Sequence, residues 1–162
     1  MIMITKKDFD EVADKDMYYV AKRWDYYKYV IEMIERIQPD SVIELGAYKL
    51  PLVKDCDVMD IHPYVENTII QDANDMPWNI DKEYDLFIGL QCMEHFKDPR
   101  AVFQEIKRIS KSAIISIPYM WKTSSESHNG LNESTLREWS GVEPASQDIV
   151  RRRLIAYYKF EE

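Results

Sequence analysis

Acidic side chains recur in this sequence where successive apolar runs end. Glu44 ends one run, Asp60 ends the next, and Asp72 follows a third. Ligands of open parallel sheets bind beyond the carboxyl ends of the strands, so these carboxylates would share one edge. A carboxylate there can accept hydrogen bonds from both hydroxyls of a ribose, and a second one can accept from an exocyclic amine. A lone strand-end aspartate is often only a turn residue, but repetition on successive strands favours a binding site.

Two histidines and a tyrosine supply groups that can move or orient a proton. His95 follows the fourth apolar run, Tyr119 follows the fifth, and His128 lies in a later polar stretch. Imidazole titrates near neutral pH, so either histidine can take a proton from a hydroxyl, and a tyrosine can orient a substrate. Each also has a structural alternative, as a turn residue for His95, a surface loop residue for His128 and a packing aromatic for Tyr119.

Periodicity predicts the elements that position these residues. Apolar residues at steps of three or four predict a helix over 16–37, which Pro39 ends, and further helices over 98–111 and 132–141. A last strand over 148–160 is expected to be long and antiparallel. Short runs rich in Ile and Val predict strands buried on both faces at 41–45, 57–61, 67–71, 84–90 and 112–119.

This order of elements predicts an α/β fold with a Rossmann-like open, mostly parallel sheet. Only 15 residues separate Glu44 from Asp60, and only 11 separate Asp60 from Asp72. These connections are too short for full crossover helices, so we expect reduced helical cover in the first half of the sheet. We expect one domain over 1–162, consisting of a leading helical segment, a binding core and a closing segment at 1–39, 41–119 and 120–162.

The first predicted helix carries more aromatic residues than one buried face needs. Trp24 and Tyr27 lie on its apolar stripe and are assigned to the core. The remaining tyrosines are expected to face a substrate or a second subunit: Tyr18, Tyr19, Tyr26 and Tyr29. The arginines at 151–153 would alternate across the last strand, as is usual for a solvated edge strand.

Composition restricts the classes of partner. The chain has 162 residues, 46% of them hydrophobic, and 29 acidic against 21 basic residues give a net charge of −8. That charge disfavours duplex nucleic acid as a partner. No apolar run approaches the roughly 18 residues that a membrane span needs, and the start has no signal-peptide pattern, so we expect a cytoplasmic protein that does not bind membranes. Cys56 and Cys92 form no CxxC pair and are expected to be free thiols.

Residues 41–119 resemble the class I S-adenosylmethionine-dependent methyltransferases, particularly their small-molecule, type-11-like branch. The strongest match is "QDANDMPWNIDKEYDLFIGLQCMEHFKDPRAVFQEIKRISKSAIISIPY" (71–119), with its Asp-Ala step, "YDL" strand, "EH…DP" turn and "IISIP" strand. "VIELGA" is similar to the first motif of the family and "VMDIHP" to its acidic second strand. The resemblance implies S-adenosylmethionine as cofactor and methyl transfer to an oxygen or nitrogen of a small-molecule acceptor.

The resemblance also implies roles at the adenosine end of the cofactor. Asp60 would bind the ribose hydroxyls, and Ile61 would pack on the adenine. Asp72 would accept from the adenine amino group, and the Ala73 backbone would lie beside the ring.

At the methionine end, Glu44 and Gly46 would lie by the methionine part, and Ala47 is small enough to allow contact. Gln91 would line the methyl-donor end. His95 is then the favoured proton acceptor, because the strand order places it nearest the methyl donor.

The glycine-rich loop of the family is reduced in this chain. The family pattern is close to E/D-x-G-x-G-x-G, whereas the run here is "ELGAYKLP", with Tyr48 and Leu50 in place of the second and third glycines. S-adenosylmethionine has no pyrophosphate, so the loop need not approach it as closely as a dinucleotide loop must. We therefore expect one glycine to suffice. A nicotinamide-dependent oxidoreductase is disfavoured, because it needs a glycine-rich turn that feeds a helix.

Glu94, His95 and His128 are also residue types that bind divalent metals. In some relatives a carboxylate at the position of Gln91 helps to complete such a site. The loss of one anionic ligand weakens a site for a hard metal, so we expect no metal to be bound.

An alternative from another class stays open. A methyltransferase-like module that has lost or weakened cofactor binding could serve only in binding or assembly, which the reduced loop and the missing early helices would explain. Thin helical cover on the first half of the sheet would also leave apolar surface for a second subunit, so a homodimer is possible. The polar segment 120–133 does not indicate which molecule accepts the methyl group.

Overall fold

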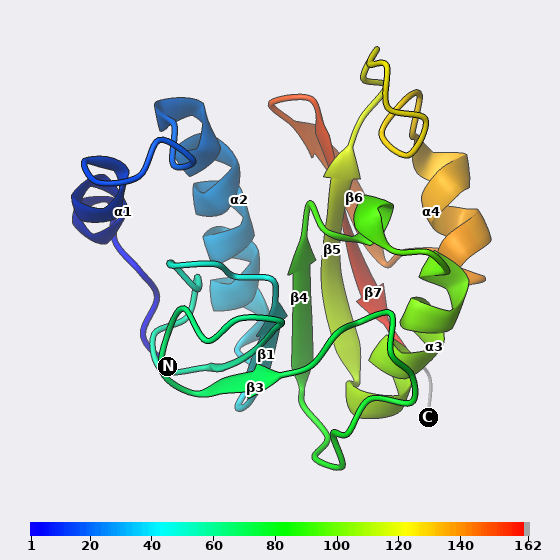
Figure 1. Cartoon of the computed structure of the whole chain (residues 1–162), viewed down its shortest axis with the longest axis horizontal. Coiled ribbons are helices and arrows are strands. Elements are labelled where there is room, and N and C mark those ends of the chain that lie inside the picture. Colours follow the sequence, from blue (N-terminus) through cyan, green and yellow to red (C-terminus); the bar gives the residue numbers. More distant parts are fainter. Residues whose placement is uncertain (161–162) are drawn as a thin grey trace.

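The computed structural model describes residues 1–160, in which seven strands form one sheet with helices on both sides (Figure 1). The sheet has the order β3-β2-β1-β4-β5-β7-β6. Its first five strands run parallel, and β7 runs antiparallel to both β5 and β6. The strands are β1 (Val42–Leu45), β2 (Asp57–Asp60), β3 (Thr68–Ile70), β4 (Leu86–Leu90), β5 (Ser112–Pro118), β6 (Ser146–Val150) and β7 (Arg153–Lys159).

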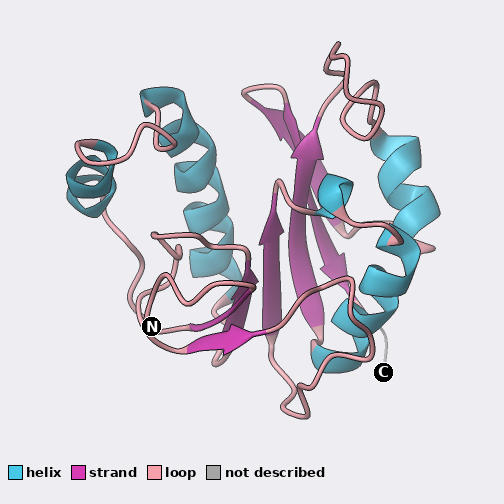
Figure 2. Ribbon diagram, in the orientation of Figure 1, coloured by secondary structure: helices cyan, strands magenta, loops and turns pink. Residues whose placement is uncertain are grey.

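Two pairs of helices cover opposite faces of the sheet (Figure 2). Helices α1 (Lys6–Ala13) and α2 (Ala21–Ile37) lie on one face, and α3 (Pro99–Ile109) and α4 (Glu133–Ser140) lie on the other. A short 3₁₀ turn, η1 (Met93–His95), follows β4. No helix within residues 1–160 is long and apolar enough to span a membrane.

The core lies in two layers because the side chains of each strand alternate between the faces. In β1, Val42 packs in the layer under α1 and α2, and Ile43 packs in the layer under α3 and α4. β5 contributes side chains to both layers, and all seven of its residues are buried. The predicted α/β fold with an open, mostly parallel sheet is confirmed.

The predicted lack of helical cover between the early strands is also confirmed. No helix interrupts the chain from β1 to β4. The N-terminal segment supports this region instead, because Met3 forms an antiparallel bridge with Val53, and the Ile4 N–H donates to the Leu52 carbonyl at 3.0 Å. A segment distant in sequence therefore replaces the missing crossover helices.

The first predicted helix was placed too early in the chain. α2 begins at Ala21 and not at 16, because the Asp16 carboxylate accepts the Tyr18 N–H at 2.9 Å and closes a turn there. The prediction also missed α1, which a reciprocal capping box between Thr5 and Asp8 stabilises. Met17, an apolar residue near the start of the predicted helix, is 93% exposed.

The single final strand was also wrong, because β6 and β7 form a hairpin. Arg151 and Arg152 occupy its turn with φ of 50° and 59°. Arg153 is buried rather than solvated, and its guanidinium lies 5.0 Å from the ring centre of Tyr26. β6 forms one edge of the sheet, opposite the edge formed by β3, and β7 lies between β5 and β6.

Two burial predictions need correction as well. β3 was expected to be buried on both faces, but it is the edge strand and Ile70 is 65% exposed. Tyr19 and Tyr26 were expected to point away from the core, but both are buried in the core layer to which α1 and α2 contribute. Tyr27 is buried as predicted.

Candidate functional site

A cavity of about 270 Å³ lies at the carboxyl ends of β1, β2, β3 and β4. Six of the predicted site residues line it: Gly46, Asp60, Ile61, Asp72, Ala73 and His95. They come from four loops that follow four different strands. The topology thus brings together residues up to 49 positions apart, as expected where parallel strands end at a common edge.

Gly46 turns the chain away from β1 at the cavity wall. Its φ is +66°, a left-handed conformation that glycine adopts without strain, and its N–H donates to the Met59 carbonyl at 2.9 Å. A Cβ added at Gly46 would meet only the Cβ of Cys92, at 3.9 Å. The backbone conformation, and not a close contact within the protein, therefore calls for glycine here.

Tyr48, which replaces the second glycine of the family pattern, points away from the cavity. Its hydroxyl donates to Asp16 at 2.9 Å, and its ring lies 4.6 Å from that of Tyr64. Ala47 is buried in the layer under α1 and α2 and does not line the cavity. Tyr48 therefore anchors the loop to the N-terminal segment, and Gly46 is the residue of the loop that lines the cavity.

Glu44 is buried beneath the same loop. One carboxylate oxygen accepts the Leu52 N–H at 2.8 Å, which ties the loop back to β1. Burial raises the pKa of Glu44 to about 8, so the carboxyl group is largely protonated at neutral pH. The side chain is absent from the cavity wall, and its contact with a cofactor stays a prediction.

Asp60 and Asp72 present carboxylates from neighbouring strands. Oδ1 of Asp60 accepts the His62 N–H at 3.3 Å, and Oδ1 of Asp72 accepts the Asn74 N–H at 2.8 Å. These turns fix both side chains while Oδ2 of each has no hydrogen bond within residues 1–160. Each aspartate can stabilise its turn and bind a ligand at the same time, because Oδ1 accepts the turn hydrogen bond and Oδ2 is left for the ligand.

Gln91 ends β4 in a left-handed conformation, with φ of 55°. Its side-chain amide donates to the Ser116 hydroxyl at 3.1 Å, so the side chain is held against β5. The residue does not line the cavity, and its place at the methyl-donor end stays a prediction.

Glu94, His95 and His128 form a cluster beside the cavity. A carboxylate oxygen of Glu94 lies 3.7 Å from Nε2 of His95, and the rings of His95 and His128 are 4.7 Å apart. Burial raises the pKa of Glu94 to about 7. Burial and the neighbouring His128 lower the pKa of His95, which favours its neutral form.

Tyr119 lies outside this group. Its N–H donates to the Arg152 carbonyl at 2.9 Å, and it follows β5 beside the β6–β7 hairpin. A hydrogen bond with Glu133 of α4 raises the pKa of the Tyr119 hydroxyl. That contact directs the hydroxyl toward α4.

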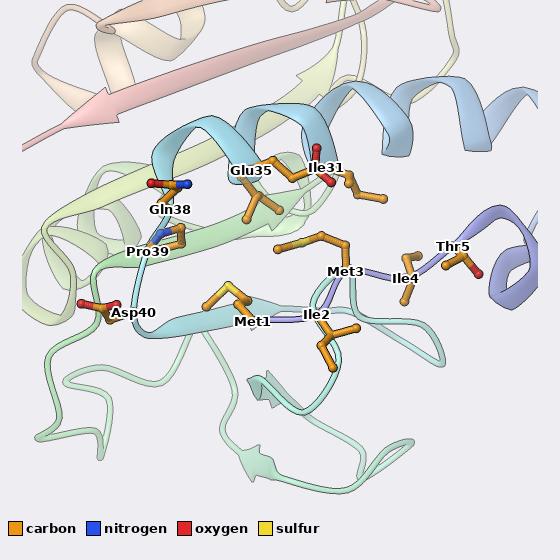
Figure 3. A pocket seen from close by; sticks show the side chains of 11 residues that line it. Met1, Ile2, Met3, Ile4, Thr5, Ile31, Glu35, Gln38, Pro39 and Asp40 are labelled. Carbon is orange, nitrogen blue, oxygen red and sulfur yellow. The ribbon is translucent and has the colours of Figure 1, made fainter.

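A larger cavity, of about 720 Å³, lies elsewhere in the molecule (Figure 3). Its walls are the first five residues of the chain and the last turns of α2 with Gln38, Pro39 and Asp40. It contains none of the predicted site residues and does not reach the strand ends that form the smaller cavity. Size alone therefore does not mark the site.

Comparison with known proteins agrees with the geometry of the smaller cavity. The family described as "Methyltransferase domain" matches residues 42–113. This range includes β1 to β4, η1, α3 and all six predicted residues that line the cavity. No sequence among the curated proteins matches the chain.

Solved structures of methyltransferases share the fold of this chain. An S-adenosylmethionine-dependent methyltransferase from Clostridium acetobutylicum has 11% identity and a TM-score of 0.69, over 96% of this chain and 99% of that one. N-methyltransferase NodS from Bradyrhizobium japonicum, in complex with S-adenosyl-L-homocysteine, has 13% identity and a TM-score of 0.59, over 83% and 87%. An Escherichia coli rRNA methylase has 12% identity and a TM-score of 0.69, over 96% and 71%.

The match of residues 42–113 to the methyltransferase family and the fold shared with the solved structures agree with the resemblance of the sequence to the class I methyltransferases that use S-adenosylmethionine. The cavity fits that cofactor chemically. It offers two carboxylates for the hydroxyl and amino groups of adenosine, and the exposed side chain of Ile61 offers an apolar surface for a ring.

Five further residues line the cavity but were not predicted: Leu45, Gln71, Asn74, Cys92 and Phe96. Two of them fix its rim. The Gln71 side chain donates to the backbone carbonyls of Asp72 and Asp75, and the side-chain amide oxygen of Asn74 accepts the Lys97 N–H at 3.0 Å. Each lies within three residues of a predicted one, so extending the prediction along each strand-end loop would have found them.

Proposed function

We propose that the protein transfers the methyl group of S-adenosylmethionine to an oxygen or nitrogen of a small-molecule acceptor. The observation that carries this proposal is the convergence of Gly46, Asp60, Asp72 and His95 on one cavity at the strand ends. When bound, the cofactor supplies an electrophilic methyl group on a sulfonium. The chain supplies binding, orientation and exclusion of water.

The two carboxylates support the adenosine part of the proposal. Asp60 would accept from the ribose hydroxyls, and Asp72 would accept from the adenine amino group, each through the oxygen that its own turn leaves free. Ala73 is buried between them in the cavity wall, so its backbone would lie beside the ring. Gly46, on the neighbouring strand end, would lie toward the methionine part.

Methyl transfer from a sulfonium depends mainly on an in-line approach of the nucleophile, so positioning and desolvation do most of the catalytic work. A general base is optional. His95 is the histidine on the cavity wall, and its lowered pKa favours a neutral ring that can accept a hydrogen bond from an acceptor hydroxyl. Tyr119 and His128 are weaker candidates for direct contact, because neither lines the cavity.

The acidic surface supports a small molecule as acceptor. A net charge of −8 opposes the approach of an RNA or DNA backbone, which needs compensating cations. The cavity is also near the lower end of the size range for pockets that bind drug-sized ligands. Its rim would accommodate a compact acceptor better than a long polymer.

Two measurements test the proposal. Calorimetry with S-adenosyl-L-homocysteine should show one site per chain, and an absence of heat at millimolar concentration would contradict cofactor binding. S-adenosylmethionine with a labelled methyl group is then incubated with a cell extract, which is separated into small-molecule, RNA and protein fractions. We expect label among the small molecules.

The Asp60→Ala variant is the control, because its weaker cofactor binding should reduce the transfer of label at a concentration of S-adenosylmethionine that does not saturate it. Label in the RNA fraction that disappears on ribonuclease treatment would replace the small-molecule acceptor by RNA. Label in the protein fraction would replace it by a protein.

A further inference from the structure

We propose that Glu94, His95 and His128 form a site for one divalent transition-metal ion, with zinc as the best match, beside the cavity. Each residue offers one ligand atom, and the three atoms lie within 4.8 Å of one another. Ligand atoms that share a zinc ion lie about 3 to 4 Å apart, because each is about 2 Å from the metal. Side-chain movements of about 1 Å would therefore close the group on an ion.

The carboxylate of Glu94 is an independent sign that a ligand is needed here. Glu94 is 4% exposed, and its Oε2 is buried with no hydrogen-bond partner within residues 1–160. A buried carboxylate oxygen without a partner costs free energy, and such atoms in native proteins usually contact a water or an ion. Nε2 of His95 lies 3.7 Å from the other oxygen of the same group. A cation between them would satisfy both.

The surroundings of His128 prepare its ring to bind a metal. Its Nδ1 lies 3.0 Å from the Ser125 hydroxyl and 2.8 Å from the Ser127 hydroxyl. A ring that donates its Nδ1 proton to a hydroxyl carries a lone pair on Nε2, which is the form that metals bind. Metal-bound histidines commonly have a second hydrogen bond of this kind, which fixes the tautomer and the ring orientation.

Gln91, whose presence argued against a metal in the sequence, does not belong to this group. Its side chain is bonded to Ser116 on β5. The donor set is therefore two imidazoles and one carboxylate, which is the set of a three-ligand zinc site with an open position. Two imidazoles favour transition ions over Mg²⁺ and Ca²⁺, which prefer oxygen ligands.

The place of the cluster indicates what the open position would hold. His95 lines the cavity and also belongs to the cluster. In Figure 1, the turn that follows β4 lies beyond the arrowhead of β4 and beside β5, and the loop that follows β5 lies beyond the arrowhead of β5. An ion there would bind an oxygen of the methyl acceptor and lower the pKa of a hydroxyl directly. This assignment of the acceptor as an oxygen compound rests on the proposed function, and with the ion bound His95 is a ligand and not a base.

The test measures metal binding directly on the full chain, purified without a histidine tag and freed of metal with a chelator. Co²⁺ is titrated and its visible absorption recorded, and Zn²⁺ affinity is measured by competition with a chelating dye. We expect one ion per chain, and no comparable binding of Mg²⁺. The His128→Gln and Glu94→Gln variants should each bind Zn²⁺ at least about tenfold more weakly.

His62→Gln is the matched control, because His62 is the third histidine of the chain and lies outside the cluster. It should bind the ion as tightly as the unmodified protein. No binding by the unmodified protein, or equal binding by His128→Gln and His62→Gln, would overturn the proposal. His128 lies in a loop, so its variant should fold even if the buried Glu94 variant does not.

Calorimetry with S-adenosyl-L-homocysteine on the metal-free protein separates the two proposals. If the cofactor product binds but no metal does, only the metal site fails. If the metal binds but the cofactor product does not, only the proposed function fails, together with the assignment of the acceptor.

Discussion

Loops connect the strands in the half of the sheet formed by β1, β2 and β3. In the half formed by β4 to β7, α3 connects β4 to β5 and α4 connects β5 to β6. β5 is buried along its whole length, but no residue of β3 is fully buried. The cavity lies where the two halves meet, and the first half supplies most of its lining. Strand-end loops carry the binding groups, and the second half supplies the packed scaffold.

This division follows from what each region must do. A binding residue needs a free polar atom at the surface, which Asp60 provides from the end of β2 and Asp72 from the loop after β3. A scaffold residue needs many apolar contacts, which the buried face of α3 provides. The two halves should therefore respond differently to the same kinds of change.

The largest difference is expected for one substitution made in both halves. Ile106→Ala on α3 removes a fully buried side chain and should lower the free energy of unfolding by about 2–5 kcal/mol. Ile70→Ala on β3 removes a side chain that is 65% exposed and should change that free energy by no more than about 0.5 kcal/mol. Urea unfolding of both variants measures the difference. Equal losses would refute the division into scaffold and binding regions.

A pH dependence is expected from Glu44, the buried acid of the first half. Its pKa is raised to about 8, so the folded state binds a proton that the unfolded state releases above its ordinary pKa of 4.5. The stabilisation is complete below pH 4.5 and is lost as the pH rises toward 8. The free energy of unfolding should fall by about 1.4 kcal/mol per pH unit in this range, about 4 kcal/mol from pH 5 to 8.

Glu44→Gln keeps an oxygen for the Leu52 N–H but cannot ionise. Urea unfolding of both proteins at pH 5, 6, 7 and 8 isolates the contribution of Glu44, because all other groups titrate alike in the two. Parallel curves would show that Glu44 has an ordinary pKa and is hydrated.

The two ends of β2 give the next comparison. Asp60→Ala, at the carboxyl end, should weaken S-adenosyl-L-homocysteine binding by about ten- to hundredfold, because hydrogen bonds to a charged group contribute about 1.5–3 kcal/mol. Asp57→Ala, at the amino end, should leave that affinity unchanged. It should lower stability by about 1–3 kcal/mol, because the hydroxyl of buried Tyr84 loses its acceptor, at 2.6 Å. Calorimetry and urea unfolding of both variants measure the two effects. An unchanged affinity of the Asp60→Ala variant would show that the cavity is not the cofactor site.

Most of the fold could be predicted because its signals are local. Five parallel strands follow from apolar runs, and α3 begins at Pro99 after Asp98, whose side chain caps it as expected. α1 was missed because a capping box and one buried residue, Phe9, carry it, without an apolar stripe. The hairpin was missed because two arginines adopt left-handed conformations, which residue type does not suggest.

The site could be predicted as far as strand order decides it. Asp60 and Asp72 line the cavity because parallel strands deliver their ends to one edge. Glu44 and Gln91 occupy the same strand ends, but distant partners, the Leu52 N–H and the Ser116 hydroxyl, turn them elsewhere. Such partners depend on tertiary packing, which periodicity does not reveal.

The smallest expected effect concerns the one glycine that the shortened loop keeps. Gly46 and Gly141 have nearly the same conformation, with φ of +66° and +71°, but Gly46 lines the cavity and Gly141 ends α4. Alanine at either position adopts the left-handed region at a cost of about 1–2 kcal/mol, so both variants should lose the same stability. Calorimetry should show weaker S-adenosyl-L-homocysteine binding for Gly46→Ala alone, because only its added methyl group enters the cavity wall. If both variants bind normally, the loop takes no part in binding and the carboxylates of β2 and β3 hold the cofactor without it.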